Sequence, residues 1–229
     1  VFPDYQPISN PENVKFFENY WNTNLDPNPG LTVVEIMEEI YNKKINGLYI
    51  MGENPAMSDP NANHAREALA RLDTLIVQDI FLTETAYLAD IVLPASAFPE
   101  KTGTFTNTDR RVQLGRKAVN PPGDAKQDWW IIQELAKRFD LNWNYNGPDE
   151  IYDELRNCME SIKNISWERL VKEGAVTYPC DDENKPGNEV IFGEGFPTNN
   201  KKGRLVPANV ISPDEVPDKE FPFVLTTGR

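Results

Sequence analysis

The sequence predicts an α/β fold, a parallel sheet with flanking helices, followed by a smaller helical and irregular region. Three short apolar runs, at residues 48–51, 75–77 and 91–93, have the length of buried strands. A helical pattern at residues 62–72 and a short helical turn at residues 83–88 separate these runs. Strand, helix, strand, helix, strand is the order of a parallel sheet with right-handed crossovers.

The chain changes in character after these strands. The cluster N-P-P-G-D at residues 120–124 is typical of a boundary between modules. We therefore expect an α/β unit in residues 1–118 and a helical and irregular region in residues 119–229. The other expected elements are helices at 16–21, 32–41, 127–139, 148–159 and 166–173 and strands at 190–192, 205–207 and 223–226.

The helix that begins after Thr32 has the clearest start signal. Thr32 and Glu35 have the spacing of a capping box, in which each side chain bonds to the other residue's backbone N–H. Apolar residues then recur at helical intervals up to Tyr41. This pattern predicts a helix with one buried face.

The composition excludes several classes of partner. The 229 residues contain 23 Lys and Arg against 36 Asp and Glu, a formal net charge of −13. Nucleic acids and anionic lipids both require a concentrated basic surface, so we expect neither as a partner. No apolar run approaches the roughly 20 residues of a membrane helix, so we expect no membrane insertion by this chain.

Cys158 and Cys180 stand far apart and match no metal-ligand spacing. Two reduced thiols in a cytoplasmic protein are the simplest interpretation. The chain begins without an initiator methionine, and it stops at Arg229 where a strand pattern leads into a glycine turn. We therefore expect a fragment of a longer protein.

Polar residues and glycines follow all three predicted strands. Ligands of open parallel sheets bind beyond the carboxyl ends of the strands, so these residues are candidates for a binding crevice. Carboxylate and amide groups there can bond sugar hydroxyls or the edge of a guanine-like ring. The candidates are Gly52, Glu53, Asn54, Gln78, Asp79 and Gly103.

Structural roles are alternative interpretations of the same residues. Residues 52–55 also read as a plain turn, and Asp79 or Thr83 can cap the helical turn that follows. His64 is the one histidine of the chain and lies near the start of a surface helix, which favours a solvated or capping role.

Longer stretches resemble the molybdopterin oxidoreductase family. These are T-E-T-A-Y-L-A-D-I-V-L-P-A-S-A-F-P-E at residues 83–100, M-G-E-N-P at 51–55, V-Q-D-I-F at 77–81 and T-G-T-F-T-N at 102–107. Together with Asp128-Trp129 they are similar to the catalytic (alpha) subunit of molybdenum- or tungsten-dependent formate dehydrogenases. The likeness runs over nearly the whole chain and is densest from Leu48 to Lys137.

The resemblance implies a bis-molybdopterin guanine dinucleotide cofactor with Mo or W, held between two α/β halves. Residues 1–118 would then be part of a split dinucleotide-binding domain. By resemblance, five residues fall on positions that contact one dinucleotide: Asp79, Thr83, Gly103, Lys117 and Asp153. A solvated helix carboxylate is the alternative for Asp153.

The resemblance also implies what this chain lacks. The family's catalytic cysteine or selenocysteine, the ligands of its four-iron four-sulfur cluster and the arginine beside its metal have no counterpart here. We therefore expect no catalytic and no metal-ligating residue in this chain, and no activity of the fragment alone. The expected partners of the intact enzyme are formate, oxidised to carbon dioxide with two electrons, and electron-transfer subunits or acceptors.

Three other readings stay open. One is the molybdopterin-like structural and electron-transfer subunit of respiratory NADH dehydrogenase, which keeps the α/β shell without molybdenum. Another is a different molybdopterin oxidoreductase, such as a nitrate reductase. The third is a stand-alone α/β interaction domain.

Overall fold

The computed structural model describes residues 1–212 and 216–225. The contacts within the chain divide it into two units, Val1–Glu189 and Val190–Arg229. All helices and strands of the described residues lie in the first unit. The boundary that the sequence predicts after residue 118 stays a prediction.

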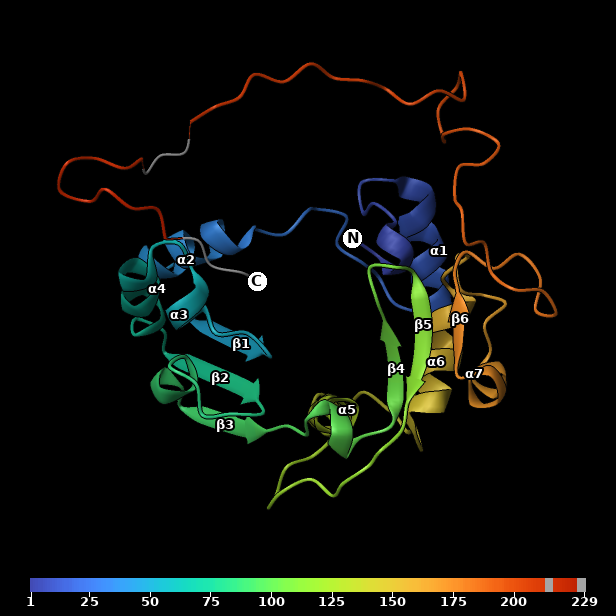
Figure 1. Cartoon of the computed structure of the whole chain (residues 1–229). Helices are drawn as coiled ribbons and strands as arrows, with labels where there is room; N and C mark the ends of the chain where they lie inside the picture. Colours follow the sequence, from blue (N-terminus) through green and yellow to red (C-terminus); the bar gives the residue numbers. More distant parts are fainter. Residues whose placement is uncertain (213–215, 226–229) are drawn as a thin grey trace. The chain divides into compact units, whose positions relative to one another are not determined.

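The first unit contains the predicted parallel sheet. Strands β1 (Gly47–Met51), β2 (Thr74–Asp79) and β3 (Ile91–Pro94) pair in the order β1-β2-β3 (Figure 1). All pairs are parallel, with Ile50 opposite Val77 and Val77 opposite Val92. The α/β fold class is therefore confirmed.

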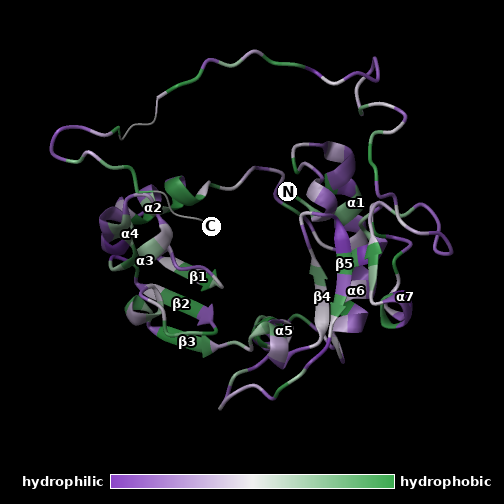
Figure 2. Cartoon of the chain, in the orientation of Figure 1, coloured by the Kyte–Doolittle hydropathy of each residue, from purple (hydrophilic) through white to green (hydrophobic). Residues whose placement is uncertain are grey.

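Helices α2 (Val33–Tyr41) and α4 (Ala62–Leu69) supply the core of this sheet. Their apolar side chains cluster with Leu75 and Val77 of β2, which are almost completely buried. The predicted capping box is present, because Thr32 and Glu35 exchange side-chain-to-backbone bonds. The short helix α3 (Pro55–Ser58) and the 3-10 turn η2 (Ala86–Leu88) follow β1 and β2. In Figure 2 the three parallel strands are mostly hydrophobic, whereas the last residues of β2 are hydrophilic.

A second, antiparallel sheet was not among the expected elements. It consists of β4 (Gly103–Thr106), β5 (Arg111–Gly115) and β6 (Ala175–Thr177), in that order. Helices α6 (Pro148–Asn157) and α7 (Trp167–Glu173) pack against it. The shared core includes Val112, Tyr152, Leu170 and Val176.

The remaining elements are α1 (Pro11–Trp21), α5 (Asp128–Arg138) and the 3-10 turns η1 (Pro3–Tyr5) and η3 (Phe98–Glu100). The strands expected at 190–192 and 205–207 are wrong: these residues have no strand partner. Residues 223–225 are not a strand either, and Thr226 lies outside the described residues. No helix within residues 1–212 and 216–225 is long and apolar enough to cross a membrane.

Candidate functional site

The carboxyl ends of β1, β2 and β3 form a continuous edge, which we call the carboxyl edge (residues 52–54, 78–83 and 94–97). The backbone N–H of Gly52 donates to the carbonyl of Gln78 at 2.9 Å. The carbonyl of Asp79 accepts from the N–H of Ala95 at 3.0 Å. The structure therefore brings Gly52, Gln78 and Asp79 to one edge of the sheet, whereas Gly103 lies on β4 of the antiparallel sheet.

Asp79 lies at the end of β2 and is half-buried. Its Oδ1 accepts from the backbone N–H groups of Ile80 (2.6 Å) and Phe81 (3.4 Å). Among the described residues its Oδ2 has no hydrogen-bond partner, and the carboxylate forms no ion pair. Asp79 thus caps the turn behind the strand and keeps one oxygen available to a ligand.

Thr83 caps the next turn. Its Oγ1 accepts from the backbone N–H of Ala86 at 3.2 Å. The hydroxyl hydrogen remains available as a donor, because a hydroxyl can accept and donate at once. The alternative capping roles of Asp79 and Thr83 are thus observed, and they leave room for a ligand contact.

Asn54 joins the loop after β1 to the segment that follows residues 78–83. Its Oδ1 accepts from the N–H (3.1 Å) and hydroxyl (2.7 Å) of Thr85, and its Nδ2 donates to Glu84 at 2.8 Å. This donation lowers the pKa of Glu84. The amide of Asn54 is therefore engaged by the protein. Glu53 beside it is exposed, and Gly52 has a φ of +66°, which favours glycine.

Gln78 is completely buried, and its side-chain amide also joins separate segments of the chain. Its Oε1 accepts from the hydroxyl of Tyr49, and its Nε2 donates to Oδ1 of Asp128 at 2.8 Å. The other oxygen of Asp128 pairs with Lys101. This network joins the sheet to the start of α5. The sequence does not reveal this network, because an aspartate in the first turn of a helix is common for its favourable interaction with the helix dipole.

Gly103 and Lys117 lie on and beside the β4–β5 hairpin. Gly103 pairs with Gly115, and the backbone N–H of Lys117 donates to Oγ1 of Thr102 at 3.1 Å. The side chain of Lys117 is exposed and forms no ion pair within the described residues. Asp153 lies on α6, 53% exposed, and its Oδ1 accepts from Arg156 Nε at 2.6 Å.

The free groups fit a nucleotide-like ligand. A Cβ placed on Gly52 or Gly103 would meet no atom within 4 Å, so the backbone is approachable at both. Asp79 offers an acceptor for amino or hydroxyl hydrogens, and Lys117 offers a cation for phosphate. The assignment of all nine predicted residues to a cofactor site stays a prediction.

A pocket of about 870 Å³ lies elsewhere in the first unit, between α1, α5 and α6. None of the nine predicted residues lines it. We place the candidate cofactor site at the carboxyl edge, because this edge carries the free donor and acceptor groups that a dinucleotide needs. One half of a binding site that lies between two halves of a protein need not enclose a cavity by itself.

Comparison with known proteins gives several long similarities. The chain is 50% identical to the F420-dependent formate dehydrogenase subunit alpha of Methanocaldococcus jannaschii, over all of this chain and 34% of that protein. It is 42% identical to the F420-dependent formate dehydrogenase 2 subunit alpha of Methanococcus maripaludis, again over 100% and 34%. The assimilatory nitrate reductase catalytic subunit of Bacillus subtilis is 38% identical, over 99% and 33%. The chain thus spans about a third of the length of these relatives.

A solved structure and a family profile agree with this. Acetylene hydratase from Pelobacter acetylenicus is similar with a TM-score of 0.53 and 25% identity, over 63% of this chain and 20% of that one. The profile described as molybdopterin oxidoreductase matches residues 12–138, more than half of the chain. This segment contains all three parallel strands and the whole carboxyl edge. The chain therefore belongs to the molybdopterin oxidoreductase family.

Proposed function

We propose that this chain forms part of the binding site for a molybdopterin guanine dinucleotide in a formate dehydrogenase alpha subunit. The observation that carries the proposal is the 50% identity with a formate dehydrogenase alpha subunit over the entire chain. The nitrate reductase relative is less similar, at 38%, so formate is the proposed substrate. Oxidation of formate to carbon dioxide is proposed for the longer protein as a whole.

Within this site, residues of the carboxyl edge and three residues outside it, Gly103, Lys117 and Asp153, have separate tasks. Oδ2 of Asp79 accepts from an amino or hydroxyl group of the dinucleotide, and the hydroxyl of Thr83 donates to it. Gly52 and Gly103 let the ligand approach the backbone, and Lys117 pairs with a phosphate oxygen. Asn54 and Gln78 act indirectly, since their amides hold the loops in place. Glu53, which is exposed beside Gly52, and Oδ2 of Asp153 are further proposed acceptors.

When bound, the cofactor with its Mo or W supplies the two-electron redox chemistry. The four-iron four-sulfur cluster, the catalytic residue and the contacts with electron acceptors belong to other parts of the longer protein in this proposal. The cytoplasm is the proposed compartment, which the two free cysteines support.

The test is the substitution Asp79→Asn in the complete protein, with Asp73→Asn as the control. Asp73 directly precedes the opposite end of the same strand and is exposed. Loss of the charged acceptor should weaken cofactor binding by about 1–3 kcal/mol, because ligand donors lose their partner. The measurement is the ratio of guanine nucleotide and of Mo or W to purified protein.

The outcomes separate two claims. Asp79→Asn should lower both ratios, whereas Asp73→Asn should leave them at the wild-type value. Equal ratios in all three proteins would reject Asp79 as a contact. A wild-type protein that carries no guanine nucleotide and neither metal would reject the proposed function itself.

A further inference from the structure

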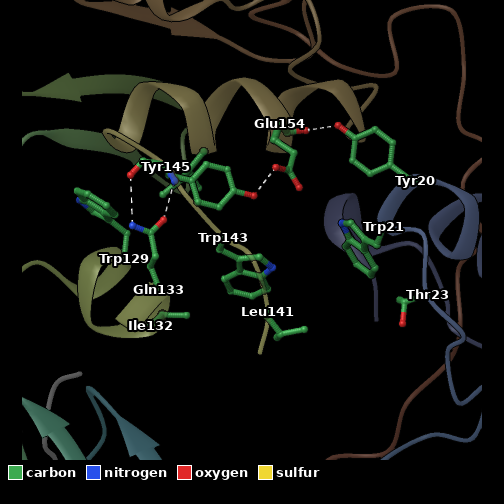
Figure 3. A pocket seen from close by; sticks show the side chains of 11 residues that line it. Tyr20, Trp21, Thr23, Trp129, Ile132, Gln133, Leu141, Trp143, Tyr145 and Glu154 are labelled. Atoms are coloured by element: carbon green, nitrogen blue, oxygen red, sulfur yellow. Dashed lines mark hydrogen bonds between the residues drawn. The ribbon is translucent and has the colours of Figure 1, made fainter. Parts of the chain in front are cut away.

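The pocket between α1, α5 and α6 has an unusual lining. Its volume is about 870 Å³, within the usual range for ligand sites. Figure 3 shows Tyr145, Glu154 and Tyr20 in a row along one wall. Three indole side chains complete the aromatic lining: Trp21, Trp129 and Trp143.

Hydrogen bonds hold this wall in place. The side-chain amide of Gln133 bonds both backbone groups of Tyr145, with Oε1 accepting at 2.6 Å and Nε2 donating at 3.3 Å. The hydroxyl of Tyr145 donates to Oε2 of Glu154 at 2.5 Å, and that of Tyr20 donates to the carbonyl of Glu154 at 2.8 Å. The bonds link α5, the 139–147 loop, α6 and α1, so the pocket is preformed.

Glu154 is the one charged residue among those that line the pocket. Within the described part of the chain, its Oε1 has no hydrogen-bond partner. Burial raises the pKa of Tyr145 to about 12 and also raises that of Tyr20, so both phenols are neutral at pH 7. Trp21 and Trp143 are 40% and 41% exposed, which leaves their rings accessible from the pocket.

We propose that this pocket receives an arginine side chain from a basic segment of a partner protein. A guanidinium group stacks on aromatic faces, is weakly hydrated and donates to carboxylates, so it matches both the indoles and Glu154. Tryptophan, tyrosine and arginine are also the residues that dominate protein interfaces. The net charge of −13 favours the approach of a basic partner.

A neutral aromatic guest fits the same space less well. It would cover the free oxygen of Glu154 without offering it a donor, and an unpaired buried carboxylate is costly. A lone small cation would leave most of the volume unfilled. An arginine with its neighbouring residues both fills the space and satisfies the carboxylate.

The test is titration of the complete protein with the peptide Gly-Ser-Gly-Arg-Gly-Ser-Gly. Isothermal titration calorimetry and tryptophan fluorescence measure the binding. The matched ligand has citrulline in place of arginine, which keeps the shape and removes the charge. We expect saturable binding of the arginine peptide and at least about tenfold weaker binding of the citrulline peptide.

Three variants locate the binding. Glu154→Gln keeps an acceptor for Tyr145 and should weaken binding about tenfold, and Trp143→Ala should weaken it similarly. Glu160→Gln makes the same charge change at a side chain that is 88% exposed and outside the pocket, and it should bind like the wild type.

Absence of binding, equal binding of both peptides, or an equal loss in Glu160→Gln would overturn the proposal. A pocket filled by another segment of the longer protein would appear as absence of binding. No residue of the proposed cofactor site lines this pocket, so failure here leaves the cofactor proposal standing, and the reverse holds as well.

Discussion

The two sheets of this protein differ in which side chains make the most bonds to the loops beside them. Around the parallel sheet, the neutral amides of Asn54 and Gln78 bridge neighbouring segments. Beside the parallel sheet, Arg66 and Arg71 each donate to a single backbone carbonyl. Beside the antiparallel sheet, two guanidinium groups each donate to several backbone carbonyls. Arg110 donates to the carbonyls of Asn188 (2.9 Å) and Glu189 (2.6 Å), and Arg169 donates to that of Lys185 (2.6 Å).

This difference affects the carboxylates nearby. In the antiparallel region Glu173 pairs with Arg169, and Asp182 pairs with Lys185. Asp79 has no ion pair among the described residues, and the amide bridges of Asn54 and Gln78 themselves add no positive charge. A carboxylate kept free in this way is suited to a ligand, whereas the paired carboxylates are suited to holding the fold.

The largest expected effect is the loss of unfolding free energy when a core leucine of either region is truncated. Leu75 and Leu170 are almost completely buried in the parallel and antiparallel regions, respectively. Leu75→Ala and Leu170→Ala should each lower the free energy of unfolding by about 2–5 kcal/mol, because each leaves a cavity. Urea unfolding measures this. A loss below about 1 kcal/mol in either variant would show that its leucine is not part of a packed core. Leu205→Ala, at a fully exposed residue, is the control.

An intermediate effect sharpens the contrast between amide and guanidinium bridges. Gln78→Ala should cost about 1–3 kcal/mol of unfolding free energy, because Tyr49 and Asp128 each lose a partner. Gln113→Ala on β5 is the matched control, since that side chain has no hydrogen bond within the described residues. Because the Gln78 amide is neutral, the loss of unfolding free energy in Gln78→Ala should change little between low and high salt. A loss that disappears in high salt would be evidence against the neutral bridge.

The smallest effect concerns alkaline pH. Burial raises the pKa of Tyr152 from 10.0 to about 12. The folded state therefore holds this proton more tightly, and the resulting stability is complete below pH 10 and is lost as the pH rises toward 12. Tyr152→Phe should lose less stability than the wild type over this interval. At pH 7 it should be about 1 kcal/mol less stable, since the carbonyl of Ile165 loses its donor.

The control for this titration is Tyr87→Phe, because Tyr87 is 74% exposed. Thermal unfolding at pH 7, 10 and 11.5 gives the comparison. If Tyr152→Phe and Tyr87→Phe lost equal stability between pH 10 and 11.5, the assigned role of Tyr152 would be wrong.

The sequence predicts the parallel sheet well because its signals are local. Apolar runs mark β1, β2 and β3, and Thr32 with Glu35 marks the start of α2. The sequence does not predict the antiparallel sheet, because its strands are short and three helices separate β5 from β6. Residues 190–192 have a strand composition but no partner strand, and composition alone does not make a sheet.

The candidate site follows the same rule. Asp79 can be found from sequence, since strand ends of a parallel sheet meet at one edge. The bond from Gln78 to Asp128 and the bond from Tyr145 to Glu154 cannot, because each joins separate elements that only the fold brings together. The resemblance to a family supplied Lys117 and Asp153, which spacing alone does not single out.

The most direct test of the central claim is an electron-density map of the complete protein with its cofactor bound. We expect a guanine dinucleotide against the carboxyl edge, with a donor atom within about 3.2 Å of Asp79 Oδ2. A map in which other side chains pack over this edge, and in which the dinucleotide lies away from Asp79, would contradict the account.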